Sequence, residues 1–358
     1  MQPHTSIEIR DTPTSVTADW LTAALRRAGH DGTVGAFEAE HVGTGQVGQN
    51  VRFRLRYASG SGPASVVGKF ASEDPTSRQT GVALENYLKE VRFYQVLKPT
   101  LDVRTPEPLL AEIDPATHAF VILMEDLAPA AQGDQIRGCS VDEAALAVVE
   151  AGRLHGPRWN DPALAGIAWL GPADPAESAA NVRTLWEGVC EPFLARYAGR
   201  LTDEEVALVR ALGARFDRYV GHREGPRTVT HGDYRLDNML FGGPAPLAVV
   251  DWQSPSLGVG TADVAYFLGT ALDPALRAAE EQALVREYLA VLRSYGIDDY
   301  DEDACWRDYR RAAFAGLVMA VIASMIVGQT ERGDEMFMTM ARRSAAMARD
   351  LDSLALLG

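Results

Sequence analysis

An acid, an amide and a second acid lie within the stretch from residue 230 to residue 252. Asp233 and Asn238 are five residues apart, and Asp251 follows 13 residues later, after the apolar run 247–250. Carboxylate and amide oxygens are hard donors of the kind that bind Mg²⁺, and a carboxylate can also accept a proton. Taken singly, a loop Asp can cap its own turn and a loop Asn can form an Asx-turn. Three such residues at these spacings favour a chemical site.

The residues around this set resemble a known family. Residues 231–238 read His-Gly-Asp-Tyr-Arg-Leu-Asp-Asn, Asp251 begins Asp-Trp-Gln, and Asp263 begins Asp-Val-Ala-Tyr-Phe. The first pattern is similar to the H-G-D-x-x-x-x-N loop of the aminoglycoside phosphotransferase and choline kinase-like superfamily, which has a protein-kinase-like fold. The other two are typical of its ecdysteroid kinase-like group. The resemblance covers most of the chain, from the loop at residue 43 through Asp263.

The resemblance implies a role for each of these residues. Phosphoryl transfer depends on positioning and charge neutralisation more than on covalent participation. Asp233 is implied to accept a hydrogen bond from the acceptor hydroxyl and to take its proton, while Asn238 and Asp251 bind Mg²⁺. Asp263 is implied to brace the loop through backbone N–H groups, although it can also be an ordinary helix N-cap. We expect His231 to be a structural histidine that hydrogen-bonds the loop backbone.

A glycine-rich stretch near the N-terminus predicts a phosphate-binding loop. Gly43, Gly45 and Gly48 have the spacing GxGxxG. The next segment, 51–57, alternates apolar residues with arginines, which predicts a half-buried strand and not the helix that a dinucleotide site requires. A glycine loop between two strands is the phosphate cover of protein-kinase-like enzymes, because backbone without a Cβ approaches phosphate oxygens closely. A surface hairpin whose glycines serve only the turn is the alternative.

A lysine on the next predicted strand adds to this hypothesis. Lys69 follows the apolar run 65–68, and we expect its ammonium to bind the α- and β-phosphates of a nucleotide. A carboxylate from the predicted helix 82–98 would orient it. Glu90 is the first choice because apolar residues flank it, and Glu85 is the second. The alternative is that Lys69 is a solvated lysine at a strand edge, and that Glu85 and Glu90 are solvated carboxylates of a helix.

Residues 121–127 resemble the segment that joins the two lobes of this family, the hinge. Backbone groups of Glu125 and Leu127 would pair with the edge of the nucleobase. Because backbone atoms make these bonds, the side chains do not distinguish ATP from GTP. A core strand followed by a turn explains the same residues.

The elements that must position these residues indicate an α+β fold. We predict a helix over 16–27, strands over 51–57, 65–70, 108–113 and 119–124, the helix 82–98, and mostly helix after residue 126. This order predicts a bilobal protein-kinase-like fold. A small antiparallel β-sheet with one helix forms the N-terminal nucleotide-binding lobe, residues 1–126. A larger α-helical lobe, residues 127–358, carries the catalytic and substrate-binding functions.

Composition and charge restrict the partners. The 358 residues contain 49 Asp and Glu against 34 Lys and Arg, a net charge of −15, which argues against nucleic acid and anionic membrane as partners. Three cysteines without a CxxC pair, and an N-terminus that does not resemble a secretion signal, predict a reduced cytoplasmic protein. The 17 uncharged residues 312–328 are expected to form a buried core helix, with a membrane span as the alternative. The acidic run 298–303 could attract a cationic substrate, although a solvated loop also explains it.

We therefore expect a Mg²⁺-dependent small-molecule kinase. It would transfer the γ-phosphate of ATP or GTP to a hydroxyl group of an antibiotic, giving resistance, or of another hydroxylated metabolite. The alternative is a catalytically silent pseudokinase that binds a nucleotide and acts through partners, against which the intact set of Lys69, Asp233, Asn238 and Asp251 argues. The sequence indicates neither the acceptor nor the oligomeric state.

Overall fold

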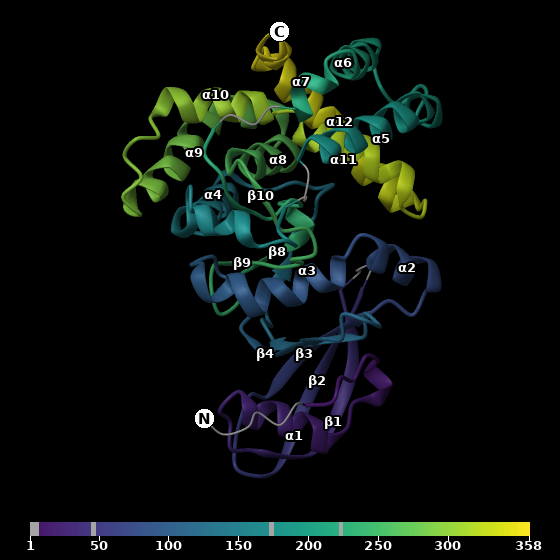
Figure 1. Ribbon diagram of the computed structural model, residues 1–358, viewed down its shortest axis with the longest axis vertical. Coiled ribbons are helices and arrows are strands. Elements are labelled where there is room, and N and C mark those ends of the chain that lie inside the picture. The colour runs from purple at the N-terminus through teal and green to yellow at the C-terminus, as the bar shows by residue number, and fades with distance from the viewer. Residues whose placement is uncertain (1–6, 44–47, 172–174, 222–224) are drawn as a thin grey trace. The chain divides into compact units, whose positions relative to one another are not determined.

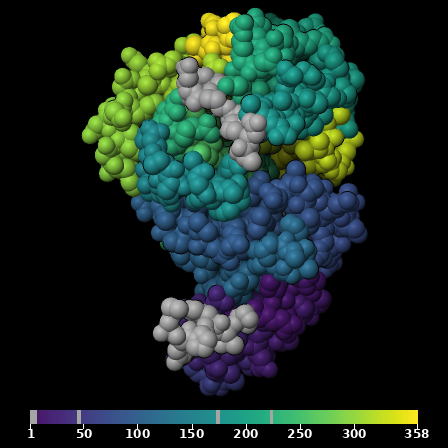
Figure 2. All heavy atoms as spheres, in the orientation of Figure 1, coloured from purple at the N-terminus to yellow at the C-terminus, as the bar shows by residue number. Residues whose placement is uncertain are grey.

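The computed structural model describes residues 7–43, 48–171, 175–221 and 225–358 (Figure 1). Its contacts divide the chain into two compact units. The first unit consists of Met1–Thr100, Thr105–Ala130 and Val250–Ser254, and the second of Leu101–Arg104, Ala131–Val249 and Pro255–Gly358. In Figure 2 purple and blue atoms belong largely to the first unit, and teal to yellow atoms to the second. The first unit contains an antiparallel sheet and the second is largely helical, which confirms the predicted α+β class.

The first unit is built on a five-stranded antiparallel sheet with the order β1-β2-β3-β5-β4. The strands are β1 Thr33–Val42, β2 Gly48–Ser59, β3 Ser65–Ala71, β4 Pro108–Ile113 and β5 Phe120–Glu125. The predicted alternation along 51–57 is confirmed, because Val51, Phe53 and Leu55 are buried while Arg54 and Arg56 are exposed.

Two sets of helices cover the two faces of this sheet. Helix α1, Ala18–Arg27, packs against the core that contains Val121 and Leu123. The other face carries Phe120, whose ring stacks on Tyr87 of α3 at a centroid distance of 4.6 Å. Side chains of a strand alternate between faces, so α1 and α3 lie on opposite sides of β5.

The predicted helix 82–98 is interrupted in the structure. It consists of the end of α2, Pro75–Ala83, then α3, Asn86–Arg92, and a π-helical turn, Phe93–Leu97. The break lies at Glu85, which has a left-handed backbone with φ +57°. A single continuous helix was therefore a wrong prediction, since apolar periodicity does not report one left-handed residue.

The second unit contains nine α-helices and two small sheets among the described residues. The helices are α4 Val141–His155, α5 Pro175–Arg196, α6 Asp203–Gly213, α7 Phe216–Val220, α8 Thr261–Ala271, α9 Pro274–Ser294, α10 Glu302–Ala312, α11 Ala315–Ile326 and α12 Glu331–Asp350. The sheets are β10-β7 and β6-β8-β9, formed by β6 Ala131–Gln132, β7 Thr228–Thr230, β8 Met239–Phe241, β9 Leu247–Val249 and β10 Ser256–Gly258. Helix α8 is buried almost along its whole length, and α4, α10, α11 and α12 pack around it. Asp263 of this buried helix contacts the segment between β7 and β8.

The apolar run near residue 320 forms α11. One face of α11 is buried against α5, α8 and α12, and Gly316 lies so close to α12 that a Cβ there would be 2.4 Å from Ser344 Oγ. The stretch Glu302–Ile326 is the one helical segment in the described residues that is long and apolar enough to cross a membrane, with 44% of its most apolar window buried. Core helices of soluble proteins pass the same test of length and composition.

Candidate active site

Lys69 lies on the face of the first unit's sheet that α3 covers. Along β3, Val66 and Phe70 belong to the core under α1, so the alternation of side chains turns Lys69 to the other face. The pairing of β3 with β5 places Lys69 opposite Ile122, two residues from Phe120. The strand register therefore directs this lysine towards α3.

Two carboxylates hold the Lys69 ammonium. Nζ lies 2.7 Å from the Glu90 carboxylate and 2.7 Å from Asp251 Oδ1. The Lys69 side chain is 7% exposed and that of Glu90 1%. The structure thus pairs Lys69 with Glu90, the first of the two predicted carboxylates, while Glu85 is exposed. Lys69, Glu90 and Asp251 are called the ion triad below.

Burial and pairing act in opposite directions on the charges of the triad. Burial by itself would lower the pKa of Lys69, but the carboxylates of Asp251 and Glu90 outweigh it and the pKa is raised. Burial raises the pKa of Glu90, and the nearby ammonium only partly opposes this. The lysine therefore keeps its charge at neutral pH, and the ionised form of Glu90 depends on it.

Asp251 has a strained backbone that its neighbours hold in place. Its φ is +68°, a left-handed conformation that costs a non-glycine residue about 1–3 kcal/mol. The next residue, Trp252, stacks on Phe93 at a centroid distance of 3.8 Å and donates from Nε1 to Thr105 Oγ1 at 2.8 Å. These contacts fix Val250–Ser254 within the first unit, and strain of this kind is concentrated at functional sites.

The described glycines of the predicted phosphate loop have specific backbone requirements. Gly43 has a left-handed backbone with φ +77°, a conformation that residues with a Cβ rarely adopt. A Cβ on Gly48 would lie 3.1 Å from Phe70 O and 3.3 Å from Lys69 Cε, so glycine lets β2 pass close to the lysine. Gly45 lies outside the described residues.

The predicted hinge residues lie at and after the end of β5. The Glu125 N–H donates to Glu107 O at 2.9 Å, and Leu127 O accepts from the Ala130 N–H at 2.9 Å. The Leu127 side chain is buried. Between them, the Asp126 carboxylate accepts from Arg52 Nε at 2.6 Å, Arg52 Nη2 at 3.0 Å and Ser65 Oγ at 2.6 Å.

Replacing Arg52 by Met is expected to destabilise the first unit by about 1.5–3 kcal/mol, the usual range for a hydrogen bond to a charged group. Burial alone would raise the pKa of Asp126, but Arg52, Ser65 and the Ala128 N–H outweigh it, so the pKa is lowered. Because folding lowers the pKa of Asp126, its ionised carboxylate stabilises the folded state at pH values above the ordinary pKa near 3.8. This stability is lost as pH falls through the pKa of the folded state. Urea unfolding should therefore separate R52M from wild type at pH 7 and less so below pH 4. An equal gap at both pH values would contradict this.

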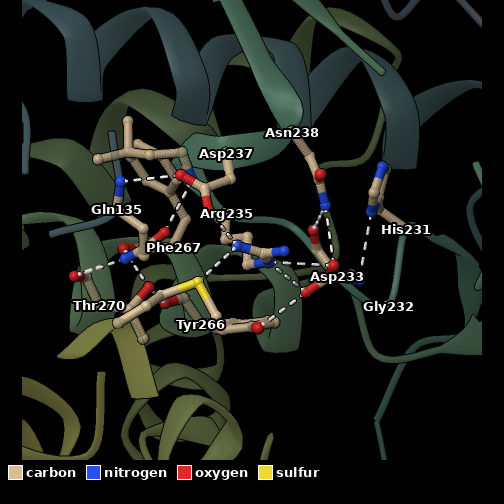
Figure 3. A network of polar contacts seen from close by, with 12 residues as sticks. Gln135, His231, Gly232, Asp233, Arg235, Asp237, Asn238, Tyr266, Phe267 and Thr270 are labelled. Carbon is tan, nitrogen blue, oxygen red and sulfur yellow. Dashed lines mark hydrogen bonds and ion pairs between the residues drawn. The ribbon is translucent and has the colours of Figure 1, made fainter. Parts of the chain in front are cut away.

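The loop between β7 and β8 is braced by Asp263 of α8. Asp263 Oδ2 accepts from the His231 N–H at 2.6 Å, and Oδ1 accepts from the Gly232 N–H at 3.1 Å. The bracing role predicted for Asp263 is confirmed. His231 is buried, and its Nδ1 accepts from the Asp233 N–H at 3.2 Å (Figure 3), which confirms a structural histidine that hydrogen-bonds the loop backbone.

A buried histidine on α4 holds Asp263 in turn. His155 Nε2 lies 3.3 Å from Asp263 Oδ2, and Nδ1 lies 3.0 Å from the Tyr288 hydroxyl. Both His155 and Tyr288 are fully buried. Gly260 packs against this pair, since a Cβ there would lie 2.7 Å from His155 Nδ1 and 2.6 Å from Tyr288 Oη.

Replacing Gly260 by Ala is therefore expected to lower both stability and activity. Both rings are fully buried, so the added methyl group should cost about 1–3 kcal/mol as an overpacked core does. Displacement of His155 would loosen Asp263 and the loop it braces. Thermal unfolding and turnover should be compared with Gly188→Ala, where nothing lies within 4 Å of the added Cβ. Similar behaviour of the two variants would show that the contact is unimportant.

Three side chains hold the Asp233 carboxylate (Figure 3). Oδ1 accepts from the Tyr266 hydroxyl at 2.8 Å, and Arg235 Nε lies 3.0 Å from Oδ1 and 3.1 Å from Oδ2. Asn238 Nδ2 donates to Asp233 Oδ2 at 2.9 Å and to Asp233 O at 2.8 Å. Burial raises the pKa of Tyr266 well above its usual value, so the hydroxyl remains a donor.

These contacts determine how the Asn238 amide is turned. A carbonyl oxygen and a carboxylate oxygen of Asp233 both accept, so the amide atom that faces them must be the NH₂ group. The amide oxygen of Asn238 consequently points away from Asp233, as a metal ligand requires.

Arg235 and Tyr266 had no predicted role. Their only signals were the position of Arg235 two residues after Asp233, and of Tyr266 within the segment that begins at Asp263.

Within the part of the chain that the structure describes, no group of three or more His, Cys, Asp or Glu residues could hold a metal by itself. Mg²⁺ does not require such a group, because it is usually bound by one or two protein ligands together with substrate phosphates and water. An amide oxygen and a carboxylate, from Asn238 and Asp251, are donors of the type that Mg²⁺ prefers. Taken singly, each of these two side chains has the chemistry that fits the metal.

Solved structures of several phosphotransferases resemble this chain. A choline kinase from Cryptosporidium parvum is 10% identical, with a TM-score of 0.55 over 89% of this chain and 90% of the other. An aminoglycoside 2'-phosphotransferase-IIIa in complex with GDP is 15% identical, with a TM-score of 0.52 over 92% and 99%. A macrolide 2'-phosphotransferase from Brachybacterium faecium is 18% identical, with a TM-score of 0.50 over 90% and 98%.

At these identities the likeness shows the fold, which is that of the aminoglycoside phosphotransferases and choline kinases, and confirms the predicted protein-kinase-like class. A search of curated proteins found no significant match. The model of the phosphotransferase enzyme family (APH) matches residues 50–306, which is well over half of the chain. The protein therefore belongs to the phosphotransferase enzyme family and is a phosphotransferase.

Proposed function

We propose that this phosphotransferase is a kinase that transfers the γ-phosphate of ATP or GTP to a hydroxyl group of a small molecule, with the help of Mg²⁺. The observation that carries the proposal is the Asp233 carboxylate, held at the end of a braced loop with the Asn238 amide oxygen turned away from it. The names of the structural relatives, which are an aminoglycoside phosphotransferase, a macrolide phosphotransferase and a choline kinase, support a small hydroxylated acceptor.

The nucleotide is assigned to residues 1–126, the predicted N-terminal lobe. Lys69 would bind the α- and β-phosphates, with Glu90 keeping its ammonium in place. Gly43, Gly45 and Gly48 would let the backbone approach the phosphate oxygens. Backbone groups of Glu125 and Leu127 would pair with the nucleobase. The GDP complex of one relative is the reason to keep GTP beside ATP as a donor.

The acceptor is assigned to residues 127–358, the predicted catalytic lobe. Asp233 would accept a hydrogen bond from the attacking hydroxyl, align it with the γ-phosphorus and take its proton as the new P–O bond forms. The bond between the γ-phosphorus and the β–γ bridging oxygen would break in the same transfer, and ADP or GDP would leave with that oxygen. The proton thus moves from the hydroxyl oxygen to a carboxylate oxygen of Asp233. Because the loop backbone is already fixed by Asp263 and His231, alignment requires little further ordering.

Mg²⁺, when bound, supplies positive charge that neutralises the phosphate oxygens during transfer. Asn238 would contribute its amide oxygen and Asp251 a carboxylate oxygen. In the first unit one carboxylate oxygen of Asp251, Oδ1, lies 2.7 Å from the Lys69 ammonium.

A phosphoryl-transfer screen tests the proposal. Purified protein is incubated with ATP or GTP, Mg²⁺ and hydroxylated small molecules, including aminoglycosides, macrolides, amino alcohols, sterols and polyols. Mass spectrometry then detects an added phosphoryl group. Product that forms only with a nucleotide and Mg²⁺ supports the kinase. Tight nucleotide binding without any transfer would favour the pseudokinase instead.

The same screen decides between a resistance role and a metabolic one. If the acceptor is an antibiotic, expression of the chain should raise the inhibitory concentration of that compound. We propose the cytoplasm as the place of action, because a nucleotide-dependent enzyme with three free cysteines, Cys139, Cys190 and Cys305, suits a reducing compartment.

A further inference from the structure

Different groups hold the main chain of the loop between β7 and β8 and the side chain of Asp233. Asp263 and His231 bond to the loop backbone and leave the two side-chain torsions of Asp233 undetermined. Those torsions are instead fixed by Arg235 and Tyr266, together with Asn238. The direction in which the carboxylate points is therefore a property of these side chains.

The donors leave limited room on the carboxylate. An ionised carboxylate offers about four lone-pair directions. Tyr266 O–H uses one on Oδ1, Asn238 N–H uses one on Oδ2, and the single N–H of Arg235 Nε is shared between the two oxygens. About one direction remains for an incoming hydroxyl. Restricting the carboxylate to one open direction is a way to align an acceptor.

Arg235 is itself fixed from the far side (Figure 3). Its Nη1 lies 2.8 Å from Asp237 Oδ2 and 3.3 Å from Met336 Sδ of α12. Asp237 is positioned by the Gln135 N–H, which donates to its Oδ1 at 3.0 Å. The Arg235 side chain is 18% exposed. The guanidinium thus bridges two carboxylates whose positions are set by separate parts of the second unit.

We propose that Arg235, anchored on Asp237, is a positioning residue that orients the Asp233 carboxylate, with Tyr266 as the second positioning donor. The inference rests on the proposed kinase function, since it concerns the alignment of the acceptor by Asp233. Arg235 and Tyr266 act through Asp233.

The first test separates turnover from nucleotide affinity. Arg235→Met is expected to lower kcat about 10–100-fold, the size of effect that a small misplacement of a catalytic group produces, while KM for the nucleotide changes less than about 2-fold. Arg235→Lys, which keeps the charge but cannot bridge both carboxylates in the same way, should recover part of the loss. Tyr266→Phe should lower kcat about 3–10-fold, because one of the donors is lost. ATP and GTP turnover is measured with the acceptor found by the screen and with water as the acceptor.

The second test asks whether the effect passes through Asp233. In an Asp233→Asn background, adding Arg235→Met should change the residual rate by less than about 2-fold, because the group that Arg235 orients is already gone. A purely structural role of Arg235 would instead lower the rate of both backgrounds by the same factor. The matched control is Arg137→Met, which removes an exposed guanidinium from the same unit and should behave as wild type.

Each result supports or overturns the positioning role of Arg235. Normal kcat in Arg235→Met, or equal losses in the two Asp233 backgrounds, would overturn the inference while an active wild type left the kinase function intact. A wild type that transfers phosphate neither to an acceptor nor to water would overturn the function, and this inference with it. If Arg235→Met fails to fold, Tyr266→Phe with its own Asp233→Asn cycle gives the decision.

Discussion

Replacing Asp233 by Asn is expected to lower the rate of phosphoryl transfer by about 10³-fold or more and to leave nucleotide binding nearly unchanged. Asn is close in size to Asp but cannot take the proton of the attacking hydroxyl, and loss of a general base costs about 10²–10⁴-fold in rate. The structure adds a second cost. One oxygen would become an NH₂ group facing Arg235, Tyr266 or Asn238, all of which donate to Asp233 in the wild type. Two donors facing each other would turn the side chain away from its position.

Single-turnover kinetics and nucleotide titration together test this variant. The rate of product formation should fall by about 10³-fold or more, while the dissociation constant of the nucleotide should change less than about 3-fold. A thermal unfolding curve close to that of the wild type shows that the loss is chemical. Turnover at the wild-type rate would remove Asp233 from the mechanism.

Replacing Lys69 by Met is expected to impair both nucleotide use and folding stability. The substitution removes the only cation of the ion triad and leaves the carboxylates of Glu90 and Asp251 close together, one of them 1% exposed. Removing one partner of a buried ion pair typically costs about 3–5 kcal/mol. Turnover should fall as well, by about 10²-fold or more, because the phosphates lose a positive charge worth several kcal/mol.

The stability loss of Lys69→Met should depend on pH in a defined direction. Burial already raises the pKa of Glu90, and loss of the ammonium would raise it further. The folded protein would then bind a proton that the unfolded chain releases, so its stability falls as pH rises between the ordinary pKa of Glu and the raised one. The deficit relative to wild type should be larger at pH 8 than at pH 5.

Two further variants complete this test. Lys69→Met combined with Glu90→Gln should be more stable than Lys69→Met alone, because no unpaired charge remains buried at residue 90. Lys89→Met, on the same helix as Glu90, serves as the control for loss of a lysine. A Lys69→Met protein with wild-type stability at every pH would show that the triad contributes nothing to folding.

Local sequence patterns predicted much of the first unit. Alternation along residues 51–57 gave the strand, and flanking apolar residues favoured Glu90 over Glu85 as the partner of Lys69. The break of the helix at Glu85 was missed, because one left-handed residue leaves no trace in apolar periodicity. The contact of Lys69 with Asp251 was also not predicted, since it joins residues 182 positions apart and depends on packing around Trp252.

The loop between β7 and β8 shows the same limit of local sequence patterns. Its residues were identified from the spacing of Asp233 and Asn238 and from a family resemblance, and the bracing by Asp263 followed from that resemblance. The hydrogen bonds that Arg235 and Tyr266 donate to the Asp233 carboxylate were not predicted. Whether an arginine two residues along a loop turns towards an acid or towards solvent depends on its other contacts, here Asp237 and Met336 of α12.

The discontinuity of the first unit has a consequence for synthesis on the ribosome. Lys69 and Glu90 emerge early, but Val250–Ser254, which completes their ion triad, follows only after the chain has grown by 182 residues from Lys69 to Asp251. At translation rates of 5–20 residues per second, that interval is about 10–35 s. During this time Lys69 and Glu90 lack their third partner, so the ion triad can be completed only after Asp251 has left the exit tunnel.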